Sequence, residues 1–142
     1  MDRVDFYLLE GSDSRTRWKF ACQQIEKAFL ADERVLVWLD PPDLTAFDEL
    51  LWTFADRSFV PHELVGPDSD WEESPVLLSA GPAPPSVPHV IVNLATELAP
   101  GTALVIRVVE IIDGDAARRL AGRNRFMRYR ELGVEPVTHK PA

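Results

Sequence analysis

The sequence predicts an α/β domain of three layers, a Rossmann-like arrangement in which helices flank a largely parallel central sheet. Segments of strand length alternate with segments of helix length along the chain. The strand-length segments 35–39 and 90–94 are largely apolar, which is typical of parallel strands covered on both faces. A chain of 142 residues suffices for one such domain. We therefore expect a single α/β domain over residues 1–142.

The first strand is predicted over 4–9 and is followed by turn residues. A helix should begin at Ser14, as its capping residue, and reach about Ala31. Its apolar side chains form one stripe, made of Trp18, Cys22, Ile25 and Phe29. The second strand is predicted over 35–39. Two prolines after it should start a second helix over about 43–54.

Residues 66–89 hold six of the twelve prolines, so most of this stretch is predicted to be a loop excursion with a short strand at 76–79. Two further strands are expected over 90–94 and 103–112. Asp113 and Asp115 should open a last helix that reaches about Leu132, and Gly133 should end it. Residues 134–142 are expected to form an irregular tail.

Charge and composition narrow the classes of function. The formal net charge is −8, yet residues 113–142 hold seven Lys and Arg against four Asp and Glu. An acidic body repels a nucleic-acid backbone, whereas one basic segment indicates a local site for an anionic partner. No apolar run approaches the ~20 residues of a membrane span. A lone cysteine excludes an internal disulfide, so we expect a cytoplasmic protein without a membrane partner.

Enzyme functions find weak support in the residues. A nucleotide site would use the turn after the first strand, but the turn at 10–14 has one glycine and two acids and matches no phosphate-binding pattern. Cys22 could act as a nucleophile, although its place on the apolar stripe favours packing. His62 after Pro61 is typical of a hydrogen-bonded turn. We expect no catalytic residue and no cofactor.

Metal binding is also poorly supported. The cysteine and the three scattered histidines show no zinc spacing. A group of acids in the proline-rich stretch could bind a cation, but its spacing is not that of a calcium loop and a solvated acidic loop is favoured. These acids are Asp68, Asp70, Glu72 and Glu73.

Trp52 is the first candidate binding residue. In the second predicted helix the apolar residues that should face the sheet are Leu44, Phe47, Leu51 and Phe54. Trp52 falls roughly 140° from the centre of that stripe, at 100° per residue. Phe59 and Val60 follow in a predicted loop. A large aromatic side chain away from the core face, next to apolar loop residues, indicates a protein contact; the alternative is that the acidic loop covers it.

The last helix is the second candidate. Ala116, Leu120 and Met127 share one side, extended by Ala117 and Ala121, and should face the sheet. A different face carries Arg119, Arg123, Phe126 and Arg130. Only Asp115 opposes six arginines between residues 115 and 130. Unpaired arginines around a ring suit an acidic peptide terminus with an apolar end. A merely solvated helix and direct binding of single-stranded DNA remain alternatives.

Four segments together resemble the chi subunit family of the bacterial DNA polymerase III holoenzyme. They are 6–9 (FYLL), 51–54 (LWTF), 58–62 (SFVPH) and 123–130 (RNRFMRYR), and the resemblance runs from about residue 4 to residue 133. It implies a non-catalytic accessory protein of the clamp loader, within a DNA-directed DNA polymerase (nucleotidyltransferase) complex in the cytoplasm at the nucleoid. The alternative is a nucleotide-binding enzyme or sensor on the same fold.

The resemblance also implies two partners. Aromatic residues matching Trp52 and Phe59, with Val60 beside them, contact the psi subunit or another clamp-loader component. A pocket for the acidic C-terminal tail of single-stranded-DNA-binding protein is implied at Arg119, Arg123, Phe126, Met127 and Arg130, so contact with DNA itself is indirect. Phe126 replaces a tyrosine common in the family and Met127 replaces a lysine, so Arg130 and Arg128 are the nearby charges.

Overall fold

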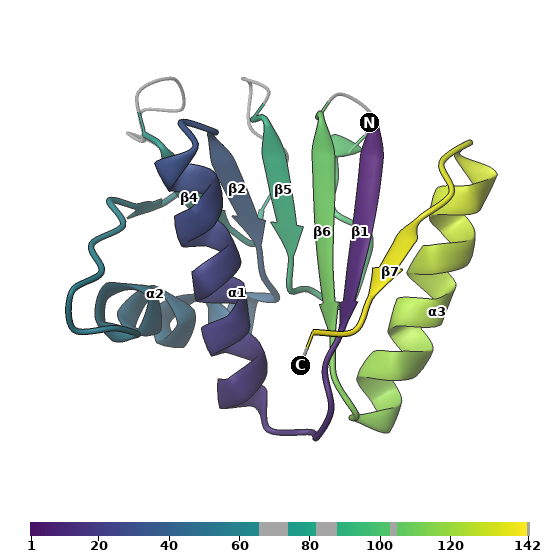
Figure 1. Ribbon diagram of the computed structural model, residues 1–142, viewed down its shortest axis with the longest axis horizontal. Coiled ribbons are helices and arrows are strands. Elements are labelled where there is room, and N and C mark those ends of the chain that lie inside the picture. The colour runs from purple at the N-terminus through teal and green to yellow at the C-terminus, as the bar shows by residue number, and fades with distance from the viewer. Residues whose placement is uncertain (66–73, 82–87, 103–104, 142) are drawn as a thin grey trace.

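The computed structural model describes residues 1–65, 74–81, 88–102 and 105–141. Its strands form one sheet in the order β3-β4-β2-β5-β6-β1-β7, and every pairing is parallel (Figure 1). The strands are β1 (Arg3–Leu8), β2 (Val35–Trp38), β3 (Glu63–Leu64), β4 (Val76–Ser79), β5 (Val90–Asn93), β6 (Arg107–Ile112) and β7 (Val137–His139). The helices are α1 (Ser14–Leu30), α2 (Leu44–Thr53) and α3 (Ala116–Glu131), with a 3-10 turn over Pro41–Asp43. The α/β prediction is confirmed.

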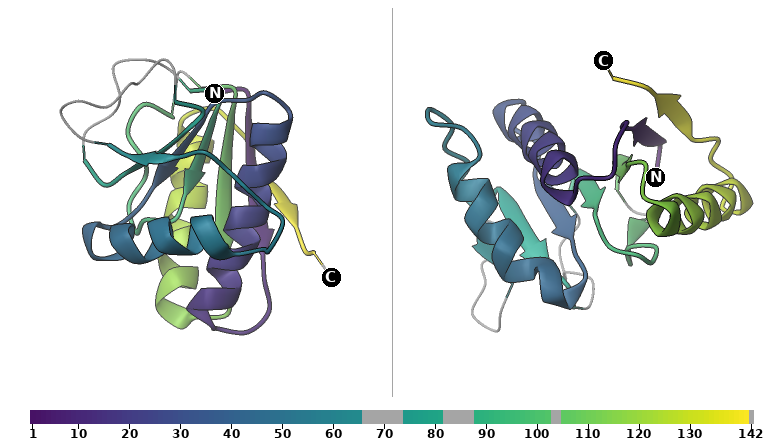
Figure 2. Two further views of the ribbon diagram at one scale, coloured as in Figure 1. Left: turned by 90° about the vertical axis from the view of Figure 1, so that its left-hand side faces the viewer. Right: turned by 90° about the horizontal axis from the view of Figure 1, so that it is seen from below.

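The sheet separates two apolar cores. On one face, α1 and α2 cover the central strands and bury Ile25 and Phe47 against alternate residues of β2, β4 and β5. On the other face, α3 buries Tyr129 against Phe6 and Val4 of β1. The end-on view of Figure 2 places α1 and α3 on opposite sides of the sheet. This arrangement is the predicted set of three layers.

Several predicted boundaries shift by a few residues. The capping residue of α1 is Asp13, not Ser14, because the Asp13 carboxylate accepts a hydrogen bond from the backbone N–H of Arg15. Strand β6 begins at Arg107 rather than 103, and residues 103–104 lie outside the described part. Within the proline-rich stretch the strand at 76–79 is confirmed as β4, whereas 66–73 and 82–87, which include the four acids, lie outside the described residues.

The tail contains a strand, so the expectation of an irregular segment over 134–142 is wrong. Residues Val137–His139 form β7, which adds to the edge of the sheet beside β1. Its short sequence has no apolar alternation of its own. Its order comes from backbone pairing with β1 and from the side chain of His139, whose Nε2 lies 2.8 Å from Oδ1 of the buried Asp5.

The face that α3 turns to the sheet differs from the predicted one. Leu120 and Met127 are 61% and 53% exposed, and the buried residues of the helix are Gly122, Arg125 and Tyr129. Ala116 and Ala117 are exposed as well. The helix takes this orientation because Glu110, fully buried on β6, needs hydrogen-bond donors, and Arg125 and Tyr129 of α3 supply them. Gly122 allows the close approach, because a Cβ there would lie 2.8 Å from Cδ1 of Ile112.

Candidate functional site

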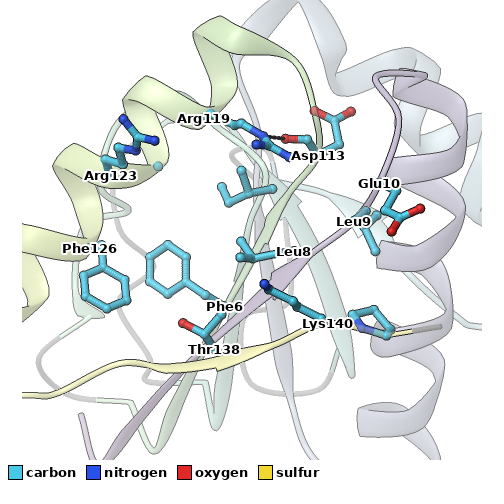
Figure 3. Close-up of a pocket in the computed structure, with 13 residues that line it drawn as sticks. Phe6, Leu8, Leu9, Glu10, Asp113, Arg119, Arg123, Phe126, Thr138 and Lys140 are labelled. Carbon is cyan, nitrogen blue, oxygen red and sulfur yellow. Dashed lines mark hydrogen bonds between the residues drawn. The ribbon is translucent and has the colours of Figure 1, made fainter.

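A pocket of about 640 Å³, here called the α3–β7 pocket, lies between α3, β1 and the C-terminal strand (Figure 3). Its lining comes from α3 on one side and from β1, the end of β6, β7 and the tail on the other. Its lining residues are Phe6, Leu8, Leu9, Glu10, Ile112, Asp113, Arg119, Gly122, Arg123, Phe126, Thr138, Lys140 and Pro141.

The floor of the α3–β7 pocket is apolar and aromatic. The rings of Phe6 and Phe126 are tilted against each other with centroids 5.2 Å apart. Phe6 also meets the ring of Tyr129 edge-on at 5.9 Å, and Leu8 and Ile112 continue the floor along the strands. Such a surface suits an apolar side chain, because burying it removes apolar area from water on both sides of the contact.

The rim of the pocket carries three cationic side chains, while Glu10 and the ion-paired Asp113 also belong to its lining. Arg119 and Arg123 come from successive turns of α3, and Lys140 enters from the tail on the opposite side (Figure 3). Nε of Arg119 donates to the backbone carbonyl of Asp113 over 3.1 Å, a bond that leaves its charge uncompensated. Among the described residues no carboxylate lies within ion-pair distance of Arg119 or Arg123. The rim therefore offers two exposed guanidinium groups to an anion.

The other arginines of α3 are paired, which corrects the expectation that only Asp115 opposes them. Arg118 bonds Asp113, Arg125 bonds Glu110, Arg128 bonds Glu131, and Arg130 bonds Glu135. Three of these four acids, Asp113, Glu110 and Glu135, lie outside the helix, and Glu131 is its last residue, where a count over residues 115–130 could not find it. Burial tends to raise the pKa of Asp113, but hydrogen bonds from Arg118 and from the backbone of Asp115 outweigh it and hold that pKa below its ordinary value.

Of the five residues predicted for this site, three line the pocket. Arg119, Arg123 and Phe126 do so, whereas Met127 and Arg130 do not. The Arg130 guanidinium lies 4.9 Å from the centre of the Phe126 ring and is held there by Glu135, whose hydrogen bond raises the pKa of Arg130. Arg130 thus flanks the aromatic floor from outside. Sequence reasoning missed Lys140 and Thr138, because it treated the tail as irregular.

Asp5 fixes the tail wall of the pocket. Its carboxylate is fully buried and is hydrogen-bonded by Arg3, Arg107 and His139. Burial tends to raise the pKa of Asp5, but these three partners together hold it below its ordinary value. The ring of His139 also stacks on Tyr7, with centroids 4.7 Å apart. Lys140 follows His139 directly, so this anchor sets where Lys140 meets the pocket.

A second candidate surface, here called the Trp52 patch, consists of Trp52, Phe59 and His62. Trp52 is 41% exposed and Phe59 is 70% exposed, with ring centroids 5.6 Å apart. The indole lies 3.9 Å from the His62 ring. Nδ1 of His62 lies 2.7 Å from the carbonyl of Val60, and its Nε2 lies 3.1 Å from Asp48, so His62 is hydrogen-bonded as predicted, in the segment directly before β3. The Trp52 ring from α2 and the Phe59 ring from the loop after it are thus both exposed to solvent.

Val60 does not belong to the exposed surface on which sequence reasoning placed it. It is fully buried and packs in the core beneath α1 and α2. Neighbouring residues in an extended loop face opposite ways, so the exposure of Phe59 goes with the burial of Val60. Val60 supports the Trp52 patch from below and does not reach a partner.

The residues weighed for enzyme chemistry have structural roles. Cys22 is fully buried in the core, and burial raises the pKa of its thiol to about 12. In the turn after β1, Asp13 caps the N-terminus of α1 with its carboxylate, where a nucleotide-binding fold receives phosphate. The carbonyl of Gly11 accepts a hydrogen bond from the N–H of Gly114, and a Cβ on Gly114 would lie 2.6 Å from that oxygen. This turn is closed by the β6–α3 loop.

The described part of the chain holds neither a metal-binding cluster nor a membrane-spanning helix. Within residues 1–65, 74–81, 88–102 and 105–141, no group of three His, Cys, Asp or Glu side chains could hold a metal ion. In the same part of the chain, each helix is too short or too polar to cross a lipid bilayer.

Two comparisons relate the chain to known proteins. A family profile described as "DNA polymerase III chi subunit, HolC" matches residues 1–137. The chain is also 35% identical, over 142 aligned residues, to the DNA polymerase III subunit chi of Pseudomonas aeruginosa. That alignment covers 99% of this chain and 97% of the relative.

Proposed function

The chain belongs to the DNA polymerase III chi subunit family, and on that premise we propose that it is a non-catalytic bridging subunit of the replication machinery. One surface would bind the clamp loader, through a psi-like subunit or another component. The other would bind the acidic C-terminal tail of single-stranded-DNA-binding protein, so that contact with single-stranded DNA is indirect. The α3–β7 pocket, an aromatic floor beneath two unpaired arginines, is the single observation that carries this proposal.

The chemistry of the α3–β7 pocket matches a peptide that ends in an apolar residue with a free carboxylate. The last side chain would pack on Phe6 and Phe126, while the terminal carboxylate meets Arg119 and Arg123. Lys140 would attract acidic side chains upstream of the terminus. Elsewhere the protein is acidic and repels such a peptide, so the net charge of −8 favours binding at this basic segment over other places.

A binding titration tests the pocket directly. A fluorescently labelled acidic peptide of about ten residues that ends in phenylalanine should bind the purified chain with a Kd of about 1–10 μM, as anisotropy reports. The affinity should fall as salt rises from 50 to 300 mM, because exposed charges are screened within a Debye length of about 10 Å at 0.1 M ionic strength.

Two altered peptides serve as controls on the probe. A C-terminal amide removes one negative charge at the arginines, and omission of the phenylalanine removes the side chain for the floor. Each should weaken binding at least about tenfold, since each change removes roughly 1.4 kcal/mol or more of interaction. Equal affinity for all three peptides would show attraction by charge alone, and the proposed pocket would be wrong.

The Trp52 patch is the proposed contact for the clamp loader. Its two exposed rings are rigid and lie against each other, which is the composition of an interface centre. The Trp52 patch comes from α2 and the loop after it, whereas the α3–β7 pocket lies at α3 on the other side of the sheet (Figure 1). Separate surfaces allow both partners to bind at once, as a bridge requires.

Replacing Trp52 by Ala should release the clamp-loader partner and leave peptide binding unchanged. Truncating a tryptophan at the centre of an interface costs about 2–4 kcal/mol, so the affinity for the clamp-loader partner should fall by roughly 30-fold or more. Tagged chains can be incubated with purified clamp-loader assembly from the same cell, and named subunits quantified by mass spectrometry. Leu30→Ala, at a residue 72% exposed on α1, is the matched control and should retain the complex. Loss of both partners in Trp52→Ala would indicate unfolding.

A further inference from the structure

A second cavity of about 320 Å³, here called the strand-end cavity, lies at the carboxyl ends of β2 and β5. It is lined from α1 by Arg17 and Trp18, from α3 by Arg118 and Arg125, and from the strand ends by Asp40, Asp43 and Thr96, with smaller side chains between them. Its lining shares no residue with that of the α3–β7 pocket. The proposed bridging function uses none of its residues.

The position of the strand-end cavity follows from the sheet order. Strands β2 and β5 are neighbours, but the chain leaves β2 toward β3 and β4 on one side and leaves β5 toward β6 on the other. In open parallel sheets, the crevice outside two strands that lead in opposite directions is where ligands bind, because the two connecting segments diverge and leave space. The strand-end cavity occupies this switch point.

Arg17 is the residue that indicates what the strand-end cavity binds. Its side chain is only 6% exposed, and its Nε donates to the carbonyl of Ile111 over 2.8 Å. Among the described residues no carboxylate lies within ion-pair distance of Arg17, and its two terminal nitrogens have no hydrogen-bond partner. Arg17 lines the strand-end cavity, and neither of its terminal nitrogens is fully enclosed by protein.

A buried, unpaired guanidinium is costly, because burial removes its hydration without supplying a counter-charge. Burial, with repulsion from Arg118, lowers the pKa of Arg17 to about 10, which still leaves it protonated near pH 7. The neighbouring arginines already have ion-pair partners: Arg118 pairs with Asp113, and Arg125 pairs with Glu110. Arg17 alone keeps an unsatisfied positive charge facing this cavity in the described part of the chain.

We propose that the strand-end cavity binds a small molecule bearing an oxyanion, a carboxylate or a phosphate, with Arg17 as the group that holds it. The volume lies at the lower end of small-ligand sites, about 300–1,000 Å³. Asp40 and Asp43 also line the cavity, and Asp40 already accepts hydrogen bonds from the N–H and hydroxyl of Thr96. Asp43 has no such donor, so the ligand should also present a hydroxyl or amino group to it.

An NMR titration with inorganic phosphate tests the proposal. Phosphate replaces chloride at constant ionic strength, and amide shifts are followed in the ¹⁵N-labelled chain. We expect saturable shifts at Ala95, Thr96 and Ala117, with a Kd of about 1–10 mM. Citrate forms a parallel arm, and saturation by phosphate, citrate or both identifies which oxyanion is preferred. Shifts that rise without saturation in both arms, or that saturate only at Arg123 and Lys140, would overturn the proposal.

Three variants and one control assign the effect to named residues. Arg17→Gln should weaken the saturable binding at least tenfold. Ala121→Leu keeps Arg17 but fills the space, and should do the same if Arg17→Gln fails to fold. Asp43→Asn removes a repelling carboxylate and should strengthen binding severalfold. Arg123→Glu is the control: it changes the α3–β7 pocket and should leave phosphate binding at the strand-end cavity unchanged. Saturable binding that survives both Arg17→Gln and Ala121→Leu would refute the assignment.

Discussion

Replacing Arg123 by Glu should weaken binding of the acidic peptide by roughly 30- to 1,000-fold, or about 2–4 kcal/mol. Arg123 has no carboxylate partner among the described residues, so its whole charge is available to the peptide. The reversal turns attraction into repulsion at the rim of an apolar floor, where partial burial of the bound peptide strengthens both. Anisotropy of the labelled peptide measures the loss.

The matched control for Arg123→Glu is Arg128→Glu. Both changes lie on exposed positions of α3 and alter the net charge equally, but Arg128 lies outside the α3–β7 pocket and pairs with Glu131. Arg128→Glu should cost severalfold in affinity at most, through the overall field alone. Neither variant should lower the melting temperature appreciably, since exposed positions contribute little to stability. Equal losses in the two variants would mean that the peptide senses charge and not this pocket.

Replacing Arg125 by Leu should lower the free energy of unfolding by about 3–5 kcal/mol, because it leaves a buried carboxylate without its counter-charge. Glu110 is fully buried on β6, and Nε of Arg125 lies 3.1 and 3.2 Å from its two oxygens. Tyr129 and Asn93 donate to the same carboxylate over 2.7 and 3.0 Å. Arg125 also bonds the carbonyl of Thr96, so the change disturbs the loop after β5.

Urea unfolding with circular dichroism would measure this loss. Arg128→Leu is the control, since its ion pair with Glu131 is exposed and should contribute about 0–1 kcal/mol. The double variant Glu110→Leu with Arg125→Leu should recover part of the stability, because a buried ion pair can be replaced by apolar groups of similar volume. A loss below about 1 kcal/mol in Arg125→Leu alone would show that α3 does not depend on this pairing.

The parts of the fold that the sequence predicts are those whose order comes from their own apolar pattern. The stretches 35–39 and 90–94 predicted β2 and β5 because strands covered on both faces are apolar throughout. The stripe of Phe47 and Leu51 predicted both α2 and the exposure of Trp52. Strands β3 and β7 escaped prediction, because short edge strands take their order from a neighbour and show little pattern of their own.

The candidate site was predictable only in part, for a related reason. Spacing on α3 placed Arg119, Arg123 and Phe126 together, and they do line one pocket. The same helical periodicity wrongly assigned Leu120 and Met127 to the sheet. It cannot reveal that the buried Glu110 pairs with Arg125 and Tyr129, which lie 15 and 19 residues away in the sequence. Lys140 was not predicted to line the pocket, because nothing in the sequence indicated β7.

The place of β1 in the sheet has a consequence for synthesis. Its two neighbours are β6 and β7, and the bond between Asp5 and His139 spans 134 residues. At about 5–20 residues per second, the first strand made waits on the order of 10 s before its last partner leaves the ribosome. Until residues 137–139 emerge, the backbone donors and acceptors on the β7 side of β1 stay open to other chains, a period that favours protection by chaperones.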